Sequence, residues 1–577
     1  MDAATSARTE HPRPQLRRAW TSLDGRWKVT LDGVATEHDV EVPFAPETPA
    51  SGIGRMGAGA CVYRRRLQVE PTAPDERLLV HFGAVDRLAT VRANGEVVAT
   101  HEGGYTAFTA DVTDHIRDGE VELVVETEDD PGDHEAPRGK QDWRDEPHLI
   151  FYPRTSGIWR TVWLERVPTT HVTEIDWRCD LGAMVVHAAV RVGAALEDSR
   201  VRVRLRHGER LVADATARVA GGLADLHLDV GEGSVDDRWG LVWWPRRPVL
   251  LDAEVEVLTG DGAVIDRAHS YTALREVGVE DGRFLLNGRP TFLRLVLDQG
   301  YWPETGATPP DGDALRRDLE LARSLGFNGV RKHQKIEDPR FLAHADELGM
   351  LVWVELPSAY RPTTRSASRL LREWADIVLA HRNHPSVVAW VPINESWGVP
   401  DLAADPRQRA LAEALAATAH ALDGTRPVSV NDGWETTGGE VVGVHDYSQD
   451  PAVIASRYRD HGALEEAMTG PGVGPFGRRI DLDGRASEGR AVVLSEFGGL
   501  APREGEDTWA YATSGTVEDF CRDYAALWRA AHDSTALAGA CWTQLTDTYQ
   551  EANGLLRADR TPKADPEVLA RATRGRS

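Results

Sequence analysis

The chain has 577 residues, which is too long for one ordinary core and predicts about three domains. Its net charge of −25 argues against nucleic acid and anionic membranes as partners, because both would repel it. A hydrophobic fraction of 41%, no apolar run of about 18 residues and a polar start unlike a secretion signal predict a soluble, cytoplasmic protein.

Residues 1–168 alternate polar and apolar side chains in short runs, as at 62–69 and 120–127. This period of two predicts an antiparallel β-sandwich. The pair Asn94-Gly95 between two such runs predicts a hairpin turn. Residues 169–275 continue the same pattern, and about seven strands in about a hundred residues favour an immunoglobulin-like sandwich.

Residues 276–577 have a different hydrophobic pattern, in which short apolar runs alternate with amphipathic stretches. This alternation is typical of parallel βα units, and eight strands in about 300 residues predict one (β/α)₈ barrel. The predicted strands are 292–296, 329–333, 351–355, 387–391, 428–431, 441–445, 492–495 and 539–544. The predicted helices are 311–325, 338–348, 366–381, 401–422 and 516–531. A Gly- and Arg-rich insertion at 448–490 is expected at the mouth of the barrel.

Nearly every predicted barrel strand ends in polar side chains, often with an aromatic beside them. The C-terminal ends of barrel strands are where such enzymes keep their chemistry. Sugars need this mixture, because hydroxyls take hydrogen bonds and C–H faces stack on aromatic rings. The candidate site residues are Asp298, Arg331, His333, Glu355, Asn394, Glu395, Asn431, Asp432, Trp434, His445, Tyr447, Glu496 and Trp542. For Arg331 the alternative is a salt bridge with Glu355 at the barrel rim.

Two glutamates stand out because each follows an apolar run: Glu395 after strand four and Glu496 after strand seven. Two carboxylates that face one pocket are the minimum for cleaving a glycosidic bond, and a separation of about 5–5.5 Å gives the retaining reaction. Asn394, next to Glu395, is a candidate ligand for a sugar hydroxyl. Arg331 and Tyr447 are candidates for holding an ionised carboxylate.

The motifs Asn394-Glu395-Ser396 and Ser495-Glu496-Phe497-Gly498-Gly499 resemble those of glycoside hydrolase family 2, which holds β-galactosidases, β-glucuronidases and β-mannosidases. The segments 156–163, 284–290 and 542–555 are also similar to that family, so the resemblance covers nearly the whole chain. It implies a sugar-binding jelly-roll sandwich at 1–168, an immunoglobulin-like sandwich at 169–275 and a catalytic barrel at 276–577. It also implies that Glu395 is the acid/base and Glu496 the nucleophile.

Some family patterns are absent. His333 stands two residues after Arg331, whereas family members often have the histidine at the third position. The Asn-x-Lys with which β-glucuronidases recognise the sugar carboxylate has no match, because residues 496–511 contain no lysine. The segment 151–155 lacks the acidic residue that lactose-cleaving relatives have there, so no metal is expected.

The sequence therefore predicts a retaining exo-β-glycosidase that acts on terminal β-D-galactosides and needs no cofactor. β-Glucuronides and unusual sugars such as arabinosides remain alternatives, as does transglycosylation. A non-catalytic carbohydrate-binding protein is the alternative from another class. The expected partner is a carbohydrate substrate, and the oligomeric state stays open, with a homo-oligomer as one alternative.

Overall fold

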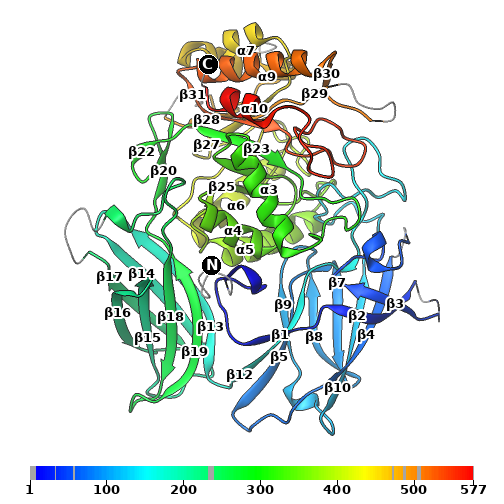
Figure 1. Cartoon of the computed structure of the whole chain (residues 1–577), viewed down its shortest axis with the longest axis vertical. Coiled ribbons are helices and arrows are strands. Elements are labelled where there is room, and N and C mark those ends of the chain that lie inside the picture. The colour runs from blue at the N-terminus through cyan, green and yellow to red at the C-terminus, as the bar shows by residue number, and fades with distance from the viewer. Residues whose placement is uncertain are drawn as a thin grey trace.

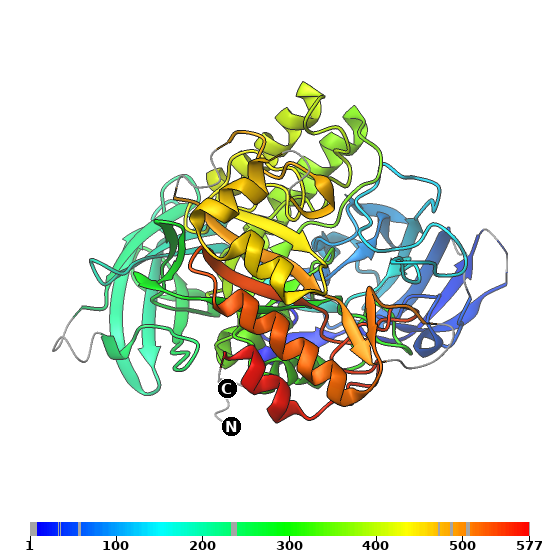
Figure 2. The same cartoon turned by 90° about the horizontal axis from the view of Figure 1, so that it is seen from above.

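In the computed structural model, the described residues are 8–32, 34, 36–55, 59–231, 239–470, 474–484, 489–502 and 508–575. They form two β-sandwiches and an α/β barrel, with the barrel above the sandwiches in Figure 1. Seen from above, the barrel lies between the two sandwiches (Figure 2). The segment that starts at Arg8 ties all three together: Arg8 contacts Asp252 of the second sandwich and Glu347 of the barrel, and Arg13 contacts Glu165 of the first sandwich.

The first sandwich packs a six-stranded sheet, in the order β3-β2-β4-β10-β7-β8, against the four-stranded sheet β1-β12-β5-β9. A third, two-stranded sheet pairs β11 with β6. Its strands are β1 (Trp20–Ser22), β2 (Gly25–Leu31), β3 (His38–Val42), β4 (Ala60–Gln68), β5 (Glu76–Phe82), β6 (Val85–Asp86), β7 (Leu88–Ala93), β8 (Glu96–Glu102), β9 (Phe108–Asp111), β10 (Glu120–Glu128), β11 (Gly157–Ile158) and β12 (Val162–Pro168). The predicted hairpin is confirmed: Asn94 and Gly95 connect β7 and β8 with φ of 47° and 91°.

The second sandwich packs the sheet β13-β14-β17 against the sheet β16-β15-β18-β19. These strands are β13 (His171–Asp180), β14 (Val185–Gly193), β15 (Arg200–His207), β16 (Arg210–Arg218), β17 (Leu223–Asp229), β18 (Leu251–Leu258) and β19 (Val264–Thr272). Alternate residues such as Val201, Val203 and Leu205 are buried between the sheets, as the period of two predicts. A small sheet of β20 (Val277–Glu280), β21 (Arg283–Leu286) and β22 (Arg289–Pro290) leads into the barrel.

The barrel contains a seven-stranded parallel sheet in the order β26-β25-β24-β23-β31-β28-β27. Its strands are β23 (Leu293–Asp298), β24 (Gly329–Lys332), β25 (Leu351–Glu355), β26 (Val387–Val391), β27 (Val441–Asp446), β28 (Ala491–Gly498) and β31 (Leu537–Thr543). The predicted strand at 428–431 is wrong as a regular strand. Two isolated parallel bridges, Trp390 to Val428 and Asn394 to Asp432, take its place beside β26.

That segment nevertheless closes the ring between β26 and β27. On one side Ser429 N donates to Trp390 O at 2.9 Å, and on the other Gly433 N donates to Gly443 O at 3.2 Å. Pro427 has no N–H to donate, and the side chain of Asp432 accepts hydrogen bonds inside the ring, so the ladder stays irregular. The polar end of this segment is therefore placed at the same rim as the ends of the true strands.

The helices surround the sheet, as predicted for alternating βα units. They are α3 (Gly312–Ser324), α4 (Pro339–Leu348), α5 (Thr364–His381), α6 (Pro406–Leu422), α7 (Pro451–Tyr458), α8 (His461–Thr469), α9 (Val517–His532) and α10 (Pro566–Thr573). The short strands β29 (Leu500–Pro502) and β30 (Ala512–Ser514) pair with each other. In the insertion at 448–490, the described residues include α7 and α8; residues 471–473 and 485–488 lie outside the described part. Among the described residues, no helix has the length and apolarity to cross a bilayer.

The barrel wall has an inner and an outer face, and this alternation decides which side chains can meet. Leu293, Leu295 and Leu297 of β23 belong to the core inside the ring, together with Trp353 and Cys541. Residues between them, such as Val296, Val330 and Trp542, belong to the core shared with the helices. Side chains alternate between the two faces of a strand, so a residue near a strand end reaches the site only when its side chain points to the inside of the ring.

Candidate active site

Glu395 lies in a sharp turn just after β26. Glu395 and Ser396 have φ of 49° and 56°, the left-handed region that non-glycine residues seldom adopt. Asn431 holds this turn, because its Oδ1 accepts from Ser396 N at 2.9 Å and its Nδ2 donates to Ser396 Oγ at 2.8 Å. Asn431, predicted as a sugar ligand, thus positions the glutamate instead of pointing a free amide at the pocket.

Glu496 faces the inside of the ring because β28 contains an extra residue. Gly443 pairs with Val493 and His445 pairs with Glu496, so β28 uses three residues where β27 uses two. Without this bulge, the alternation that places Ala491 and Val493 inside would turn Glu496 toward the helices. The bulge therefore brings the second carboxylate into the site.

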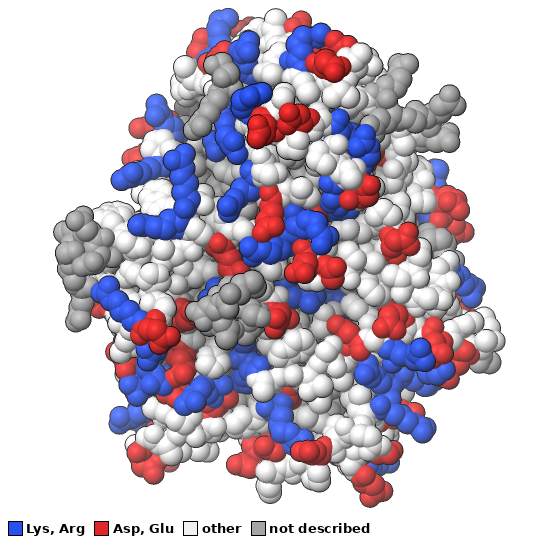
Figure 3. Space-filling view, in the orientation of Figure 1, with Lys and Arg blue, Asp and Glu red and all other residues white. Residues whose placement is uncertain are grey.

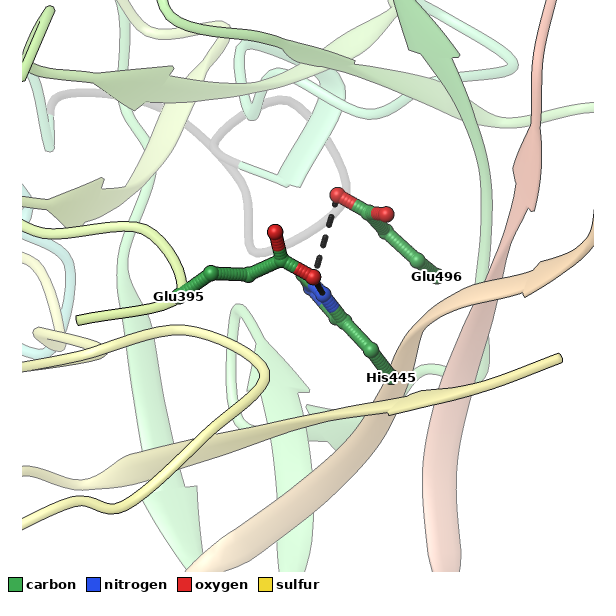
Figure 4. A group of neighbouring side chains, drawn as sticks. All are labelled: Glu395, His445 and Glu496. Carbon is green, nitrogen blue, oxygen red and sulfur yellow. Dashed lines mark hydrogen bonds and ion pairs between the residues drawn. The ribbon is translucent and has the colours of Figure 1, made fainter. Parts of the chain in front are cut away.

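The two glutamates point toward one another across His445 (Figure 4). One ligand atom each from Glu395, His445 and Glu496 lie within 4.8 Å of one another. His445 Nδ1 is 2.8 Å from Glu395 Oε1, and its Nε2 is 3.1 Å from Asp432 Oδ2 and 3.5 Å from Glu496 Oε1. This spacing of the carboxylates is that of a retaining pair.

Arg331, on the inner face of β24, connects most of the predicted residues. Its NH1 donates to Glu496 Oε1 at 2.7 Å, and its NH2 donates to Glu355 Oε2 at 2.6 Å and to Asn394 Oδ1 at 2.7 Å. Both expected partners, the candidate nucleophile and Glu355, are thus bound at once. The guanidinium is 0% exposed, so its charge is balanced entirely inside the protein.

The environment keeps Glu496 ionised. Burial alone would raise the pKa of this carboxyl, but the charges of His445 and Arg331 outweigh it and lower the pKa to about 2. The Tyr447 hydroxyl donates to Glu496 Oε2 at 2.5 Å. Burial first, and then the charge of Glu496, raise the pKa of Tyr447 well above 10, so the phenol keeps its proton and remains a donor.

His445 is a cation at neutral pH. Burial lowers its pKa, but Glu496, Asp432 and Glu395 together raise it to about 10. The pKa of Asp432 is in turn held low, because Arg331 and His445 overcome its burial. Glu395, His445 and Glu496 are close enough to surround one metal ion. A doubly protonated imidazole has no lone pair to offer, so this donor set does not suit a metal.

His333 also lies on the inner face, despite its shifted position in the sequence. It is two residues after Arg331, which keeps the two side chains on one side of the chain. Its Nδ1 is 3.0 Å from Glu355 Oε1 and 3.9 Å from Glu496 Oε1. Burial, then the charges of Lys140 and Arg331, lower its pKa well below 6.5, so this imidazole is neutral.

Two predicted residues, Asp298 and Trp542, lie elsewhere. Asp298 is at the end of β23 but on the outer face, where Lys332 Nζ donates to it at 2.8 Å. Trp542 is 0% exposed and packs against Phe497 and Tyr524 under the helices, so it offers no face to a sugar. Both expectations are corrected by the alternation of the strand. Trp434 is half-buried beneath the Arg478 guanidinium, which lies 3.8 Å from its ring centroid.

Three residues near the pair were not predicted. Tyr511 stacks on Tyr447 with ring centroids 3.8 Å apart. Glu551 accepts a hydrogen bond from Tyr152 at 2.6 Å, which joins the barrel to the first sandwich. Lys140, also from the first sandwich, lies over Trp397 at 5.3 Å from its ring centroid.

A separate cavity of about 1050 Å³ lies at the opposite end of the barrel. Arg294, Asn328 and Met350, at the beginnings of the first three barrel strands, line it together with Trp244 of the second sandwich. None of the predicted site residues takes part in it. In barrels of this kind chemistry belongs to the other rim, so the cavity is distinct from the candidate active site.

Comparisons with known proteins agree with this architecture. Residues 277–573, over half of the chain, match the family description "Glycosyl hydrolases family 2, TIM barrel domain", and residues 50–165 match "Glycosyl hydrolase 2 galactose-binding domain-like". A β-galactosidase of Thermoanaerobacter pseudethanolicus is 28% identical over 373 residues, which are 63% of this chain and 47% of the relative. The match thus spans about half the length of that curated relative.

Two solved structures share the fold over nearly their whole length. A β-galacturonidase of Eisenbergiella tayi has a TM-score of 0.76 at 20% identity, with 98% of both chains covered. A β-D-glucuronidase of Dictyoglomus thermophilum has a TM-score of 0.77 at 19% identity, again with 98% of both chains covered. At these identities the likeness concerns the fold. From the family match over the barrel, the chain belongs to glycoside hydrolase family 2.

Proposed function

We propose that this protein is a retaining exo-β-glycosidase that removes terminal sugars, with β-D-galactosides as the first substrates to test. The observation that carries the proposal is the pair Glu395 and Glu496, whose carboxylate oxygens approach within 4.8 Å. Retaining pairs lie about 5–5.5 Å apart and inverting pairs about 6.5–9.5 Å apart, so this spacing supports the retaining reaction. The side chains are 20% and 6% exposed, a narrow access that suits the end of a sugar chain.

The reaction has two displacements. First, a Glu496 oxygen attacks the anomeric carbon, the bond to the aglycone oxygen breaks, and Glu395 gives its proton to that oxygen. Then a water attacks the same carbon, Glu395 takes the proton of the water, and Glu496 leaves as a carboxylate. Glu395 suits the proton transfers because its side chain is the more open of the two to the aglycone and to water.

The surroundings support Glu496 as the nucleophile. Arg331, His445 and Tyr447 all direct protons at this carboxyl group or lie close to it. They stabilise the carboxylate before attack and again as it leaves, when negative charge returns to its oxygen. Glu355 and Asp432 lie 2.6 and 3.1 Å from Arg331, so this cation still has carboxyl groups beside it when Glu496 becomes a neutral ester.

Asn394 supports a role in binding the sugar. Its Oδ1 accepts from Arg331, so its Nδ2 is the free donor, and among the described residues this buried nitrogen has no partner. A buried donor without a partner is costly unless a ligand supplies an acceptor. A substrate hydroxyl next to the anomeric carbon would supply it, and this contact strengthens as charge develops in the transition state.

The choice of galactosides follows the names of the relatives, among which a β-galactosidase shares 28% identity over 373 residues. The test compares wild type, Glu496→Gln and Glu395→Gln on nitrophenyl β-D-galactoside. We expect Glu496→Gln to lose at least about 10⁴-fold in kcat, because the nucleophile is gone. We expect Glu395→Gln to keep more activity on this good leaving group than on an alkyl galactoside.

Proton NMR of the first product separates the alternatives. A β-anomer released first supports retention, whereas an α-anomer would contradict the proposal. Tight galactose binding without any turnover would instead favour a carbohydrate-binding protein. Product that accumulates only when an acceptor sugar is added would favour transglycosylation.

A further inference from the structure

Lys140 differs from the other buried lysines of this protein. Four of the five lysines are buried, at 1–6% exposure. Three of them have a carboxylate partner: Lys332 with Asp298 at 2.8 Å, Lys335 with Glu337 at 2.8 Å and Lys563 with Asp547 at 2.6 Å. For Lys140 no carboxylate within 4.0 Å is found among the described residues, although the residue is only 6% exposed.

The backbone of Lys140 is held from two sides. Toward the barrel, Arg138 N and Gly139 N both donate to Ser358 O at 3.1 Å, and the Tyr360 hydroxyl donates to Gly139 O. Toward its own sandwich, Tyr152 N donates to Lys140 O at 2.8 Å. The side chain is therefore aimed by a fixed backbone.

That direction leads to the catalytic pair. The Lys140 ammonium lies 5.3 Å from the centroid of Trp397, two residues after Glu395. Its charge is the strongest influence after burial on His333, whose Nδ1 is 3.9 Å from Glu496. Lys140 is thus a cation at the rim of the site, contributed by the first sandwich.

Burying a cation at the rim of the site without a carboxylate partner costs free energy. A buried charge is normally matched by an opposite charge, and a single ring face replaces only part of the lost hydration. Glu551 is the nearby acid, and after burial the charge of Lys140 is the strongest influence on its pKa, which it lowers. The Glu551 oxygens accept instead from Tyr152 at 2.6 Å and Asn553 at 3.1 Å, and no ion pair within 4.0 Å joins Glu551 to Lys140 among the described residues. On the surface of Figure 3, in contrast, basic and acidic side chains are mixed.

We propose that Lys140 binds a negatively charged group of the substrate, a carboxylate or a sulfate on the terminal sugar. The inference rests on the proposed glycosidase activity and narrows its substrate class to anionic glycosides. A lysine suits this task because a compact ammonium can reach one oxygen in a narrow pocket. The bound anion would supply the partner that the protein itself does not.

The test is the ratio of kcat/KM between anionic and neutral substrates. The probes are nitrophenyl β-D-galacturonide, nitrophenyl β-D-galactoside 6-sulfate and nitrophenyl β-D-galactoside. A charge-assisted contact predicts that Lys140→Met lowers the anionic-to-neutral ratio about 30-fold. Lys28→Met is the matched control, because Lys28 is half-exposed on the first sandwich and pairs with Asp39. It should leave the ratio unchanged.

The two anionic probes distinguish the sources of the charge: a preference for the galacturonide identifies a carboxylate, and a preference for the 6-sulfate identifies a sulfate. An equal loss on all three probes, or a wild-type preference for the neutral galactoside, overturns the role of Lys140. Both results leave the glycosidase proposal standing, whereas full activity of Glu496→Gln would refute that proposal alone.

If the wild-type protein cleaves none of the probes, calorimetry can test the inference by measuring binding. Galacturonate and galactose 6-sulfate are titrated against galactose, with wild type and Lys140→Met. We expect at least one of the two anions to bind wild type about tenfold more tightly than galactose does, and to lose that advantage in the variant. Equal affinity for the three sugars would overturn the inference.

Discussion

Arg331 and Lys332 are consecutive residues of β24, yet they belong to different chemistry. Arg331 points inside the ring to Glu355 and Glu496, and Lys332 points outside to Asp298 and Glu337. Both are cations at 0–2% exposure with carboxylates at 2.6–2.8 Å. Burial and pairing alone therefore do not mark an active site.

The difference lies in what remains unsatisfied around each cluster. On the inner side, Asn394 Nδ2 has no partner among the described residues, and Glu395 is partly open to solvent. On the outer side, Lys332 and Lys335 share Glu337, and Lys335 also donates to two backbone carbonyls, Gly300 O and Ala307 O. A cluster with an unpaired hydrogen-bond donor can bind a ligand, whereas a cluster whose donors are all paired within the protein stabilises the fold.

Removal of Arg331 is the change with the largest expected effect. Arg331→Met would leave Glu496 without its closest cation, and we expect kcat/KM to fall about 10³-fold, as for loss of a charge-stabilising donor. Circular dichroism checks that the variant is folded. A kcat/KM within tenfold of wild type would contradict the assignment of Arg331 to the catalytic cluster.

The matched change on the outer face tests the other half of the comparison. Lys332→Met leaves Asp298 and Glu337 without this partner, which predicts a loss of about 3–5 kcal/mol in the free energy of unfolding. Urea titration measures this loss. The folded fraction should keep far more activity than Arg331→Met does, and a selective loss of kcat at normal stability would break the distinction. Adding Asp298→Asn should recover part of the stability.

Gly139 offers a smaller effect at the contact between the first sandwich and the barrel. It has φ of +60°, and a Cβ there would lie 2.2 Å from Gln334 O. Gly139→Ala should therefore destabilise the docked segment by about 1–3 kcal/mol and raise KM. Gly95→Ala is the control, since Gly95 also has a positive φ but nothing lies within 4 Å of its Cβ. Equal changes in stability and KM for the two variants would show that the contact of Gly139 with the barrel does not cause the effect.

The pH dependence of stability tests the charge of His445. The pKa of His445 is about 10 in the folded protein against 6.5 ordinarily, so the folded state holds this proton more tightly. Its contribution to stability is fully present below pH 6.5 and is lost as pH rises toward 10. We expect the Tm of wild type to fall more steeply over this window than that of His445→Gln. Parallel curves would show that His445 does not carry the charge.

The sequence predicted which chain segments reach the rim, because apolar runs that end in polar residues are visible by inspection. Glu395, Arg331, His445 and Tyr447 all lie where the strand ends were expected, and the structure gathers them around Glu496. Seven of the eight barrel strands were also found near their predicted positions.

The remaining site residues depend on which face of the strand each side chain occupies. Trp542 was predicted in the pocket. Its neighbours Cys541 and Thr543 point to the inside of the ring, whereas Trp542 points to the helices. The bulge in β28 works in the opposite direction, because it turns Glu496 inward against the alternation of its strand. Neither the register nor a bulge can be derived from one sequence without knowledge of the neighbouring strands.

Lys140 illustrates a further limit. Residues 496–511 contain no lysine, and the barrel alone gives no reason to look 356 residues before Glu496. The first sandwich reaches the rim through hydrogen bonds between its own segment and Ser358, a contact between distant parts of the chain. Such contacts carry no local sequence signal.

The scarcity of lysine also affects how this protein can be handled. Four of its five lysines are buried, and Lys28, on β2 of the first sandwich, is half-exposed. Amine-reactive dyes and supports would therefore find Lys28 as the accessible side-chain amine among the described residues. Covalent coupling through Lys28 would place the linkage on the first sandwich and not on the barrel.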